Sequence, residues 1–288
     1  MNLCDYNDIR ALLGRHGFHF SKSMGQNFLI DPQVPHDIAA ASQADGDCGV
    51  LEIGPGIGPL TAELAQRAGK VVSVELDQKL LPILEETMAP YPNVEIVPGD
   101  IMKLDLAGLV SGKLAGYRPL VCANLPYNIT TPVLTRLLEC GLFQSITVLI
   151  QREVARRICA SPGSGDYGAF GLFVQWHMET ELLFDVPPSC FVPQPKVTSS
   201  VIRLRRRENP PVPVNNEALL FRIIRAAFNQ RRKTLVNALS SGLGLDKAVV
   251  EQCLEKCGFD TKIRGESLDI GRFAKIADEI GNMRGCDL

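Results

Sequence analysis

The stretch Val50-Leu-Glu-Ile-Gly-Pro-Gly-Ile-Gly58 joins a short apolar run to a turn with three glycines, and a helical pattern follows at 60–68. An apolar run of this length that stops at turn residues predicts a buried strand. Glycines in the turn would let the backbone approach a ligand closely at the mouth of a sheet. The spacing G-x-G-x-G is a weak indication by itself, so its meaning depends on the rest of the chain.

Strand and helix patterns alternate through the first half of the chain. Beyond the strand at 50–53, strands are expected at 71–76, 94–97, 119–123 and 146–150. The expected helices are 5–16, 33–41, 60–68, 79–88 and 131–140. Because this alternation implies right-handed crossovers, it predicts an α/β fold, with a parallel sheet and helices on both of its faces.

The pattern changes after residue 170. Segments 172–186 and 196–206 both read as strands, and we expect them to add an antiparallel edge to the sheet. The proline-rich stretch 209–216 reads as a linker, and helical patterns follow it at 219–228, 246–258 and 272–280. We therefore predict two domains, with the sheet in residues 1–208 and a small all-helical domain in residues 209–288.

The bulk composition indicates an ordinary soluble globular protein, with 45% apolar and 22% charged residues in 288. No apolar stretch is long enough to span a bilayer, and the first residues lack the blocks of a signal peptide. The nine cysteines are scattered, and nothing near Cys253 and Cys257 completes a zinc site. We expect a cytoplasmic protein with reduced thiols, no membrane partner and no metal.

The charge is distributed unevenly along the chain. Residues 196–233 hold ten basic and two acidic residues, a local excess of eight positive charges in a chain of net charge −2. A solvated basic face is the simple explanation of any charge run. This much local excess favours a polyanionic partner, and RNA or DNA is the first expectation.

Four successive strand ends carry residues suited to a ligand. After the glycine turn come Glu75, Asp100 in Pro98-Gly-Asp, and Asn124. Ligands of open α/β sheets bind at the carboxyl ends of the strands. An acidic residue at the second strand end would bind ribose hydroxyls, and Asp100 could accept from an adenine amino group.

The motif Asn124-Leu-Pro-Tyr127 places an amide, a rigid proline and an aromatic ring at a strand exit. The amide oxygen and a backbone carbonyl can accept the two hydrogens of a planar amino group such as N6 of adenine. The tyrosine ring can stack on the base. The four residues could also form an ordinary turn.

A dinucleotide dehydrogenase would share the first two strand-end features. It would usually show G-x-G-x-x-G, whereas here the third glycine comes one residue early and Pro59 opens the helix. S-adenosylmethionine explains the third and fourth features better. Glu75 could be only a solvated carboxylate and Asp100 only a turn residue, but their joint placement at consecutive strand ends argues against chance.

With these motifs the chain resembles the ribosomal-RNA adenine N6-dimethyltransferases over nearly its whole length. Five segments carry the resemblance: Gly25-Gln-Asn-Phe-Leu29, Glu52-Ile-Gly-Pro-Gly56, Asn124-Leu-Pro-Tyr127, Pro188-Ser-Cys-Phe-Val-Pro-Gln-Pro-Lys-Val197 and Phe228-Asn-Gln-Arg-Arg-Lys-Thr-Leu-Val-Asn237. Macrolide-resistance relatives, which methylate one adenosine of 23S rRNA, usually have Ser, a basic residue and Ile where this chain has Gly25, Ile57 and Leu125. The resemblance is therefore to the small-subunit type.

The resemblance implies a Rossmann-like methyltransferase that uses S-adenosylmethionine. It would dimethylate N6 of two adjacent adenosines in a hairpin loop near the 3' end of 16S rRNA, within the small ribosomal subunit or its precursor, and act as a monomer in subunit biogenesis. An RNA-binding assembly factor without catalysis is the alternative.

The resemblance also assigns roles to residues. The implied catalytic residues are Asn124, Leu125, Pro126 and Tyr127. The implied cofactor-binding residues are Gln26, Asn27, Leu29, Gly54, Gly56, Glu75, Leu76, Asp100, Ile101 and Asn124. The basic residues expected to bind RNA are Lys196, Arg203, Arg205, Arg222, Arg225, Arg231, Arg232 and Lys233.

Overall fold

The computed structural model describes residues 1–20 and 25–284, which group into two compact units. The first unit comprises Met1–Ala155 and Thr180–Arg206, and the second comprises Arg156–Glu179 and the chain from Arg207 onward. The second unit thus contains a segment that precedes the linker. The predicted domain boundary at residue 208 stays a prediction.

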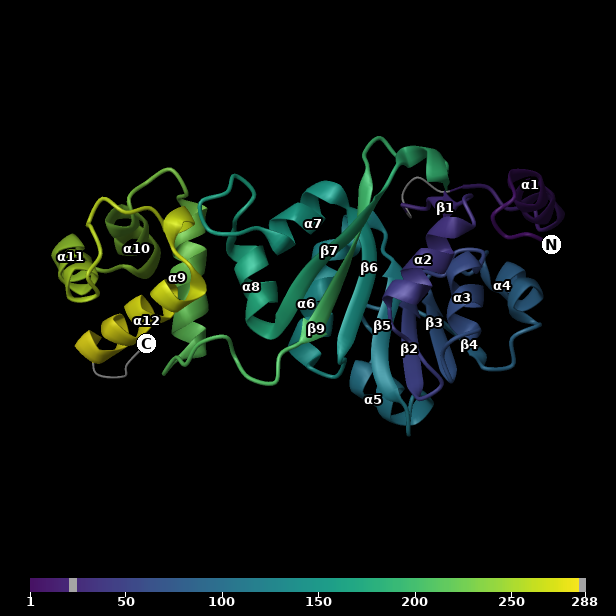
Figure 1. Ribbon diagram of the computed structural model, residues 1–288, viewed down its shortest axis with the longest axis horizontal. Helices are drawn as coiled ribbons and strands as arrows, with labels where there is room; N and C mark the ends of the chain where they lie inside the picture. Colours follow the sequence, from purple (N-terminus) through teal and green to yellow (C-terminus); the bar gives the residue numbers. More distant parts are fainter. Residues whose placement is uncertain (21–24, 285–288) are drawn as a thin grey trace. The chain divides into compact units, whose positions relative to one another are not determined.

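Among the described residues, seven strands form one sheet in the order β4-β3-β2-β5-β6-β9-β7 (Figure 1). They are β2 Cys48–Ile53, β3 Lys70–Glu75, β4 Val94–Pro98, β5 Arg118–Asn124, β6 Ser145–Gln151, β7 Met178–Val186 and β9 Ser199–Arg206. The first five strands in this order, β4, β3, β2, β5 and β6, pair in parallel with their neighbours, and β9 pairs antiparallel with β6. The predicted parallel sheet with an antiparallel addition is confirmed.

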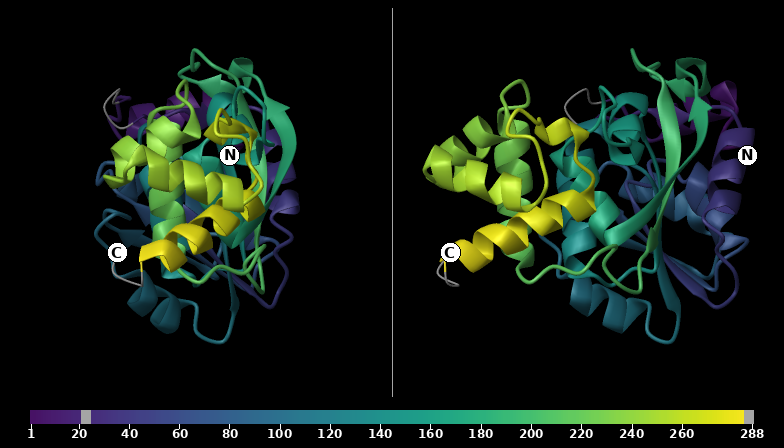
Figure 2. Two further views of the ribbon diagram at one scale, coloured as in Figure 1. Left: turned by 90° about the vertical axis from the view of Figure 1, so that its left-hand side faces the viewer. Right: turned by 60° about the vertical axis from the view of Figure 1, so that its left-hand side comes forward.

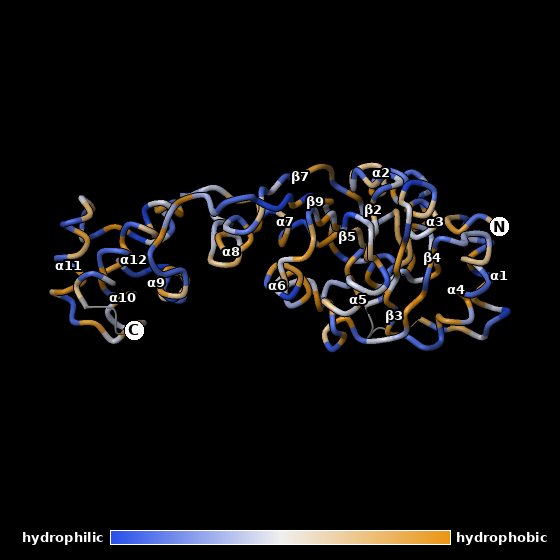
Figure 3. The backbone as a smooth tube through the Cα atoms, turned by 90° about the horizontal axis from the view of Figure 1, so that it is seen from below, coloured by the Kyte–Doolittle hydropathy of each residue, from blue (hydrophilic) through white to orange (hydrophobic). Residues whose placement is uncertain are grey.

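Helices cover both faces of this sheet. The helices of residues 1–159 include α1 Tyr6–Arg15, α2 Gln33–Ala41, α3 Pro59–Ala65, α4 Leu81–Met88, α5 Leu106–Lys113, α6 Thr130–Cys140 and α7 Arg152–Cys159. Figure 3 shows α2 and α3 on one side of the strands and α5 and α6 on the other. Ile38 and Leu64, which are fully buried, pack with Val50 and Cys122 of the central strands. The burial of such apolar side chains between layers is the main stabilising contribution of this architecture.

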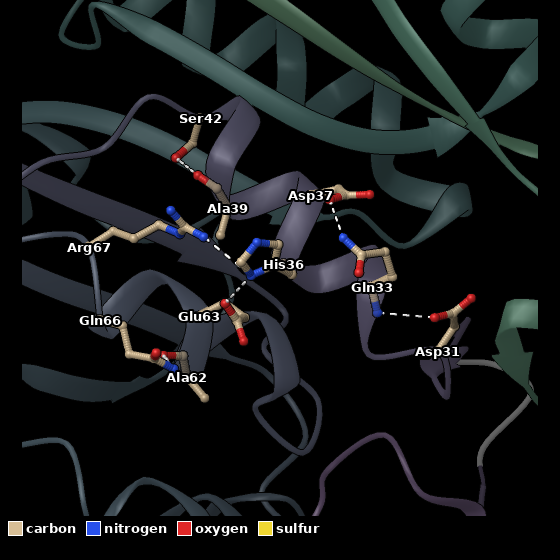
Figure 4. Close-up of polar contacts among 10 residues, drawn as sticks. All are labelled: Asp31, Gln33, His36, Asp37, Ala39, Ser42, Ala62, Glu63, Gln66 and Arg67. Atoms are coloured by element: carbon tan, nitrogen blue, oxygen red, sulfur yellow. Dashed lines mark hydrogen bonds and ion pairs between the residues drawn. The ribbon is translucent and has the colours of Figure 1, made fainter.

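Polar contacts link α2 and α3 on the side that faces solvent (Figure 4). His36 Nδ1 lies 3.1 Å from Glu63 Oε2 and 3.3 Å from Arg67 Nη2. Both partners are on or just after α3, so the histidine links two helices. Exposed pairs of this kind contribute little to stability, about 1 kcal/mol or less.

The expectation of one strand across 172–186 was wrong in its first half, which forms the helix α8 Ala169–His177. Only Met178–Val186 is strand β7. Leu172 and Trp176, one helical turn apart, are both buried in the core of the second unit, where Trp176 meets Phe221 edge-on with 5.9 Å between ring centroids. An apolar run gives no period that separates a buried helix from a buried strand, and tertiary packing selected the helix.

The second unit is otherwise built from α9 Glu217–Asn229, α10 Leu235–Leu243, α11 Lys247–Lys256 and α12 Ile270–Arg284, which Figure 2 shows from two directions. The Asn216 side chain caps α9 by accepting from the Leu219 N–H at 2.9 Å. This cap explains why the linker ends there, because it satisfies a donor that the helix leaves open. The all-helical expectation for the C-terminal part is confirmed over its described residues.

Three further observations concern membrane and metal chemistry. No helix within residues 1–20 and 25–284 is long and apolar enough to cross a membrane. Over the same residues, no group of three or more His, Cys, Asp or Glu side chains could hold a metal ion. The cysteines described there are free thiols.

Candidate active site

The carboxyl ends of β2, β3, β4 and β5 open into one cleft of about 1120 Å³, counted with its open solvent-facing space. All of the predicted catalytic and cofactor-binding residues line this cleft: Gln26, Asn27, Leu29, Gly54, Gly56, Glu75, Leu76, Asp100, Ile101, Asn124, Leu125, Pro126 and Tyr127. They converge because neighbouring parallel strands end at the same edge of the sheet. The cleft lies within the first unit.

The glycine turn after β2 approaches the segment at 25–29 closely. The Gly54 N–H donates to the Val74 carbonyl at 2.9 Å, which extends the β2–β3 pairing into the turn. Gly56 has a φ of +64°, and a Cβ on it would lie 3.1 Å from Cε1 of Phe28. A side chain at this position would be strained by the backbone angle and crowded by the phenylalanine ring.

Glu75 ends β3 with its side chain largely withdrawn from solvent, at 6% exposure. Burial raises the pKa of this carboxyl, and bonds from the backbone N–H groups of Asp77 and Gly56 partly oppose that effect. The Asp77 N–H donates to Glu75 Oε1 at 2.8 Å. The carboxyl group is therefore fixed at the cleft wall, where it can accept from ligand hydroxyls.

Asp100 is held in a similar way after β4. Its Oδ1 accepts from the Met102 N–H at 2.9 Å, and its Oδ2 lies 3.8 Å from Lys103 Nζ. An apolar residue follows each of these acids. Leu76, which follows Glu75, is 52% exposed, and Ile101, which follows Asp100, is buried. Exposed leucine beside a cleft provides a surface for a flat apolar ligand face.

These residues fit S-adenosylmethionine. Its adenosine requires acceptors for ribose hydroxyls and for an amino group, and the two strand-end carboxyls supply acceptors. Its adenine faces require apolar contact, which Leu76 and Ile101 offer. The missing Cβ at Gly56 leaves room where a side chain would crowd the cleft. The cleft also has the concave, mostly apolar character of a small-molecule site.

Glu52 also lines the cleft, although it was not among the predicted site residues. It is 1% exposed, and the hydroxyls of Thr61 and Ser73 donate to its Oε2 at 2.6 and 2.7 Å. Burial raises the pKa of this carboxyl to about 7, against the opposing effect of the two hydroxyl donors. Its protonation therefore changes near neutral pH.

The segment at 25–29 is held by one side-chain bond to Asp77, one bond within the segment and one strand pairing. Gln26 Nε2 donates to Asp77 Oδ2 at 2.8 Å, and Asn27 Nδ2 donates to the Gly25 carbonyl at 3.1 Å. Phe28–Leu29 forms β1, which pairs antiparallel with β8, Phe191–Val192. Gly25 has a φ of +64°, and a Cβ there would lie 3.0 Å from Asn128 Oδ1.

The Asn124 side chain is oriented by the same segment, because its Nδ2 donates to the Asn27 carbonyl at 3.3 Å. The Leu125 N–H donates to the Leu149 carbonyl at 3.1 Å, which continues the β5–β6 pairing past the strand end. The Pro126 carbonyl accepts from the Ile129 N–H and from Thr130 Oγ1, both at 3.2 Å. The turn is therefore rigid, and it uses the Pro126 carbonyl internally.

Tyr127 begins the short 3-10 helix Tyr127–Ile129, and its hydroxyl oxygen lies 2.6 Å from Ser199 Oγ. Burial raises the pKa of this phenol, so it stays protonated at neutral pH. Ser199 was not among the predicted site residues. No local signal marks it, because it is 72 residues away and only the pairing of β9 with β6 brings it near.

The predicted RNA-binding residues are not gathered into the cleft. Lys196, Arg203 and Arg205 belong to the first unit, and the other five belong to the second. Arg203 is only 11% exposed, and its guanidinium donates to Glu181 Oε2 on β7 at 2.6 Å and to the Ala41 carbonyl at the end of α2 at 3.2 Å. Arg205 is half-exposed and lies 3.4 Å from the same carboxylate.

In the second unit, Arg222 and Arg225 are exposed on α9, and Arg232 and Lys233 are exposed between α9 and α10. Arg231 instead bonds to Glu266 at 2.8 Å and to the carbonyls of Ser164 and Gly165. The RNA-binding role of all eight residues stays a prediction. The contacts favour an internal structural role for Arg203 and Arg231.

Comparison with known sequences gives a family match. The family described as "Ribosomal RNA adenine dimethylase" matches residues 17–281. The Ribosomal RNA small subunit methyltransferase A of Shouchella clausii (strain KSM-K16) is 48% identical over 274 residues, which is 94% of this chain and 93% of that protein. The protein of the same description from Geobacillus kaustophilus (strain HTA426) is 44% identical over 281 residues, 96% of each chain.

Solved structures share the fold. A dimethyladenosine transferase from Plasmodium falciparum superposes with a TM-score of 0.75 at 24% identity, covering 89% of this chain and 98% of the other. The 23S rRNA methyltransferase ErmE superposes with a TM-score of 0.67 at 27% identity, covering 88% and 98%. The first of these likenesses concerns the fold alone.

Proposed function

The chain belongs to the ribosomal RNA adenine dimethylase family, and we propose that it transfers methyl groups from S-adenosylmethionine to N6 of two adjacent adenosines near the 3' end of 16S rRNA. The observation that carries the proposal is the fixed Asn124 amide at the mouth of the cleft, next to strand-end carboxyls suited to an adenosine. Dimethylation of the small-subunit rRNA would serve ribosome biogenesis.

The cofactor supplies an electrophilic methyl group on its sulfonium when bound. Glu75 would accept hydrogen bonds from the ribose hydroxyls and Asp100 from the adenine amino group. Leu76 and Ile101 would contact the adenine faces. Gln26, Asn27 and Leu29 would cover the ligand, since their segment is bonded to Asp77 and to Asn124.

Asn124 and Leu125 would bind the target amino group. Asn124 Nδ2 is occupied by the Asn27 carbonyl, which leaves Oδ1 as the acceptor for one N6 hydrogen. The Pro126 carbonyl is used inside the turn, so the Leu125 carbonyl is the acceptor proposed for the second hydrogen. Two acceptors would draw N6 toward tetrahedral geometry and localise its lone pair, a form of stabilisation by prearranged dipoles.

Tyr127 would stack on the target adenine, which must leave its RNA stack to enter the cleft. No strong base is needed, because the N6 proton can leave after the methyl group has arrived. Holding the reacting atoms in line then supplies most of the remaining acceleration. The pocket must also accept monomethylated N6, which has one hydrogen fewer to donate.

The finer expectations belong to the same proposal. The exposed basic residues Arg222, Arg225, Arg232 and Lys233 support phosphate binding by the second unit. We further propose that the enzyme acts as a monomer. We place the enzyme in the cytoplasm, where ribosomal subunits are its substrate.

The test is incubation with S-adenosylmethionine and 30S subunits that lack the modification. We expect N6,N6-dimethyladenosine at two adjacent positions of 16S rRNA, measured by mass spectrometry, and no product with the Asn124→Ala variant. An unmodified 16S rRNA after incubation with the wild-type chain would contradict the proposal.

Two alternatives predict different outcomes, one in this assay and one in ribosome maturation. Methylation of naked 23S rRNA would instead favour a resistance-type activity, in line with the ErmE structural likeness. An assembly factor without a catalytic role would mature ribosomes equally well when it carries Asn124→Ala.

A further inference from the structure

The hydroxyl groups of Tyr127 and Ser199 form a short contact beside the cleft, with 2.6 Å between the two oxygen atoms. Tyr127 lines the cleft, whereas Ser199 is fully buried. The contact therefore joins the far end of a cleft-lining ring to a side chain that has no access to solvent. Such a bond limits both rotation and tilt of the ring.

Ser199 is itself held firmly by the sheet. It is the first residue of β9 and pairs with Gln151 at the end of β6. Arg152, which follows Gln151, donates its N–H to the carbonyl of Thr198, the residue before Ser199, at 3.0 Å. Strand β6 in turn pairs with β5 up to Asn124, opposite Leu149. The serine hydroxyl thus has a fixed position relative to the strand end that carries the Asn124 amide.

The other end of the tyrosine is fixed through its backbone. The residue before Tyr127 is Pro126, whose ring fixes its backbone torsion φ. The Ile129 N–H donates to the Pro126 carbonyl and closes the turn. The backbone alone leaves the ring free to choose its side-chain torsions. The bond to Ser199 selects one orientation among them.

From this geometry we propose that Ser199 is a positioning residue for methyl transfer, which holds the Tyr127 ring in the orientation that stacks on the target adenine. The inference rests on the proposed function and deepens it, since it adds a residue that acts through another. Ser199 does not touch the substrate.

The second methyl transfer depends on this orientation more than the first. Unmethylated N6 offers two hydrogens to Asn124 and Leu125, whereas monomethyl N6 offers one. With one hydrogen bond lost, the stacked ring carries a larger share of the alignment. A loosened ring should therefore slow the second step more than the first and let N6-monomethyladenosine accumulate.

The experiment compares Ser199→Ala with the wild-type chain on 30S subunits that lack the modification. Mass spectrometry follows mono- and dimethyladenosine over time, and calorimetry follows cofactor binding. We expect the second step to slow about three- to tenfold, the effect of losing one ordinary hydrogen bond. The KM for 30S subunits and the cofactor Kd should stay at their wild-type values. A general loss of structure would change both constants.

Ser200→Ala is the matched control. Ser200 is the next residue of β9, is equally buried, and donates its hydroxyl to Asp185 Oδ1 at 2.5 Å, away from Tyr127. We expect this variant to keep the wild-type ratio of mono- to dimethyladenosine. An equal ratio in Ser199→Ala and Ser200→Ala would overturn the inference while leaving methyl transfer established.

Tyr127→Phe removes the same bond from its other end without altering the buried strand, so it covers the case in which Ser199→Ala does not fold. It should also accumulate monomethyladenosine, and the double variant should be no worse than either single one, because both changes delete one interaction. Independent, additive effects would overturn the inference. A wild-type chain that transfers no methyl group would overturn the proposed function and this inference together.

Discussion

Asn124 Nδ2 donates to the backbone carbonyl of Asn27 across 3.3 Å, although the two residues are 97 positions apart. The bond joins the strand end that would hold the target amino group to the segment that would cover the cofactor. It also fixes which end of the Asn124 amide faces the cleft. The roles proposed for the two motifs are therefore physically coupled.

Asn124→Asp tests this coupling. A carboxylate keeps the shape of the side chain but cannot donate to the Asn27 carbonyl, so it loses the orienting bond. We expect kcat to fall by roughly a hundredfold or more, as when one prearranged polar group of an active site is removed. Single-turnover methyl transfer to 30S subunits measures the change.

Asn93→Asp is the control for that substitution. Asn93 Nδ2 also donates to backbone carbonyls, those of Ala65 at 2.8 Å and Ala68 at 2.9 Å, but it lies outside the cleft. The Asn93→Asp variant should have a lower melting temperature, and its kcat below that temperature should equal that of the wild-type chain. Equal losses of kcat in the two variants would contradict the role given to Asn124.

Glu75→Gln should weaken cofactor binding. The change removes the charge of an acceptor proposed for the ribose hydroxyls while keeping its size. A hydrogen bond to a charged group contributes about 1.5–3 kcal/mol, so we expect the cofactor Kd to rise roughly ten- to a hundredfold. Calorimetry measures the change, with Glu63→Gln on α3, outside the cleft, as the control. An unchanged Kd for Glu75→Gln would remove this residue from the cofactor site.

Gly25→Ala should impair catalysis by crowding the covering segment. The new Cβ would sit 3.0 Å from Asn128 Oδ1, in a backbone with a φ of +64°. Gly17→Ala provides the matched control, since Gly17 has a φ of +59° and nothing within 4 Å of its Cβ position. Both variants should lose about 1 kcal/mol of stability from the left-handed backbone. Only Gly25→Ala should also lower kcat/KM, and equal kcat/KM values would contradict the crowding.

The stability of the protein should depend on pH through Glu52. Burial raises the pKa of this carboxyl from 4.5 to about 7, so the folded chain binds a proton that the unfolded chain releases. The stabilising contribution of that proton is complete below about pH 4.5 and is lost as the pH rises to about 7.

Glu52→Gln removes this titration, because an amide oxygen can still accept from Thr61 and Ser73. Denaturant unfolding at pH 5 and pH 8 measures the effect. The free energy of unfolding of the variant minus that of the wild-type chain should be greater at pH 8 than at pH 5, by on the order of 3 kcal/mol. A difference that stays constant with pH would show that Glu52 titrates normally.

The basic residues should separate into two groups by salt dependence. Arg232 and Lys233 are exposed, so Arg232→Ala and Lys233→Ala should each weaken RNA binding and reduce the slope of log K against log salt by about one. Arg203→Ala should instead lower thermal stability, because it removes the ion pair to Glu181 at 2.6 Å and the bond to the Ala41 carbonyl at 3.2 Å. A reduced salt slope for Arg203→Ala would contradict the internal role.

The succession of the five parallel strands along the chain, and the chemical groups at four strand ends, could be predicted from the sequence. Local periodicity and turn residues carry this information, and parallel pairing makes consecutive strand ends converge. The sequence alone therefore predicts that Glu75, Asp100 and Asn124 lie together. Helices α5, α7 and α10 were not predicted. The helix at Ala169–His177 was predicted as a strand, because its apolar run fits either element.

The contacts between distant segments were decided only by the folded chain. Asn27 meets Asn124, and Ser199 meets Tyr127, through strand register and loop closure, which no local pattern encodes. The same holds for Arg203, whose charge suggested RNA but whose burial beside Glu181 follows from its place on β9. Residue type and spacing specify what chemistry is available, whereas burial and long-range pairing specify which groups remain free to perform it.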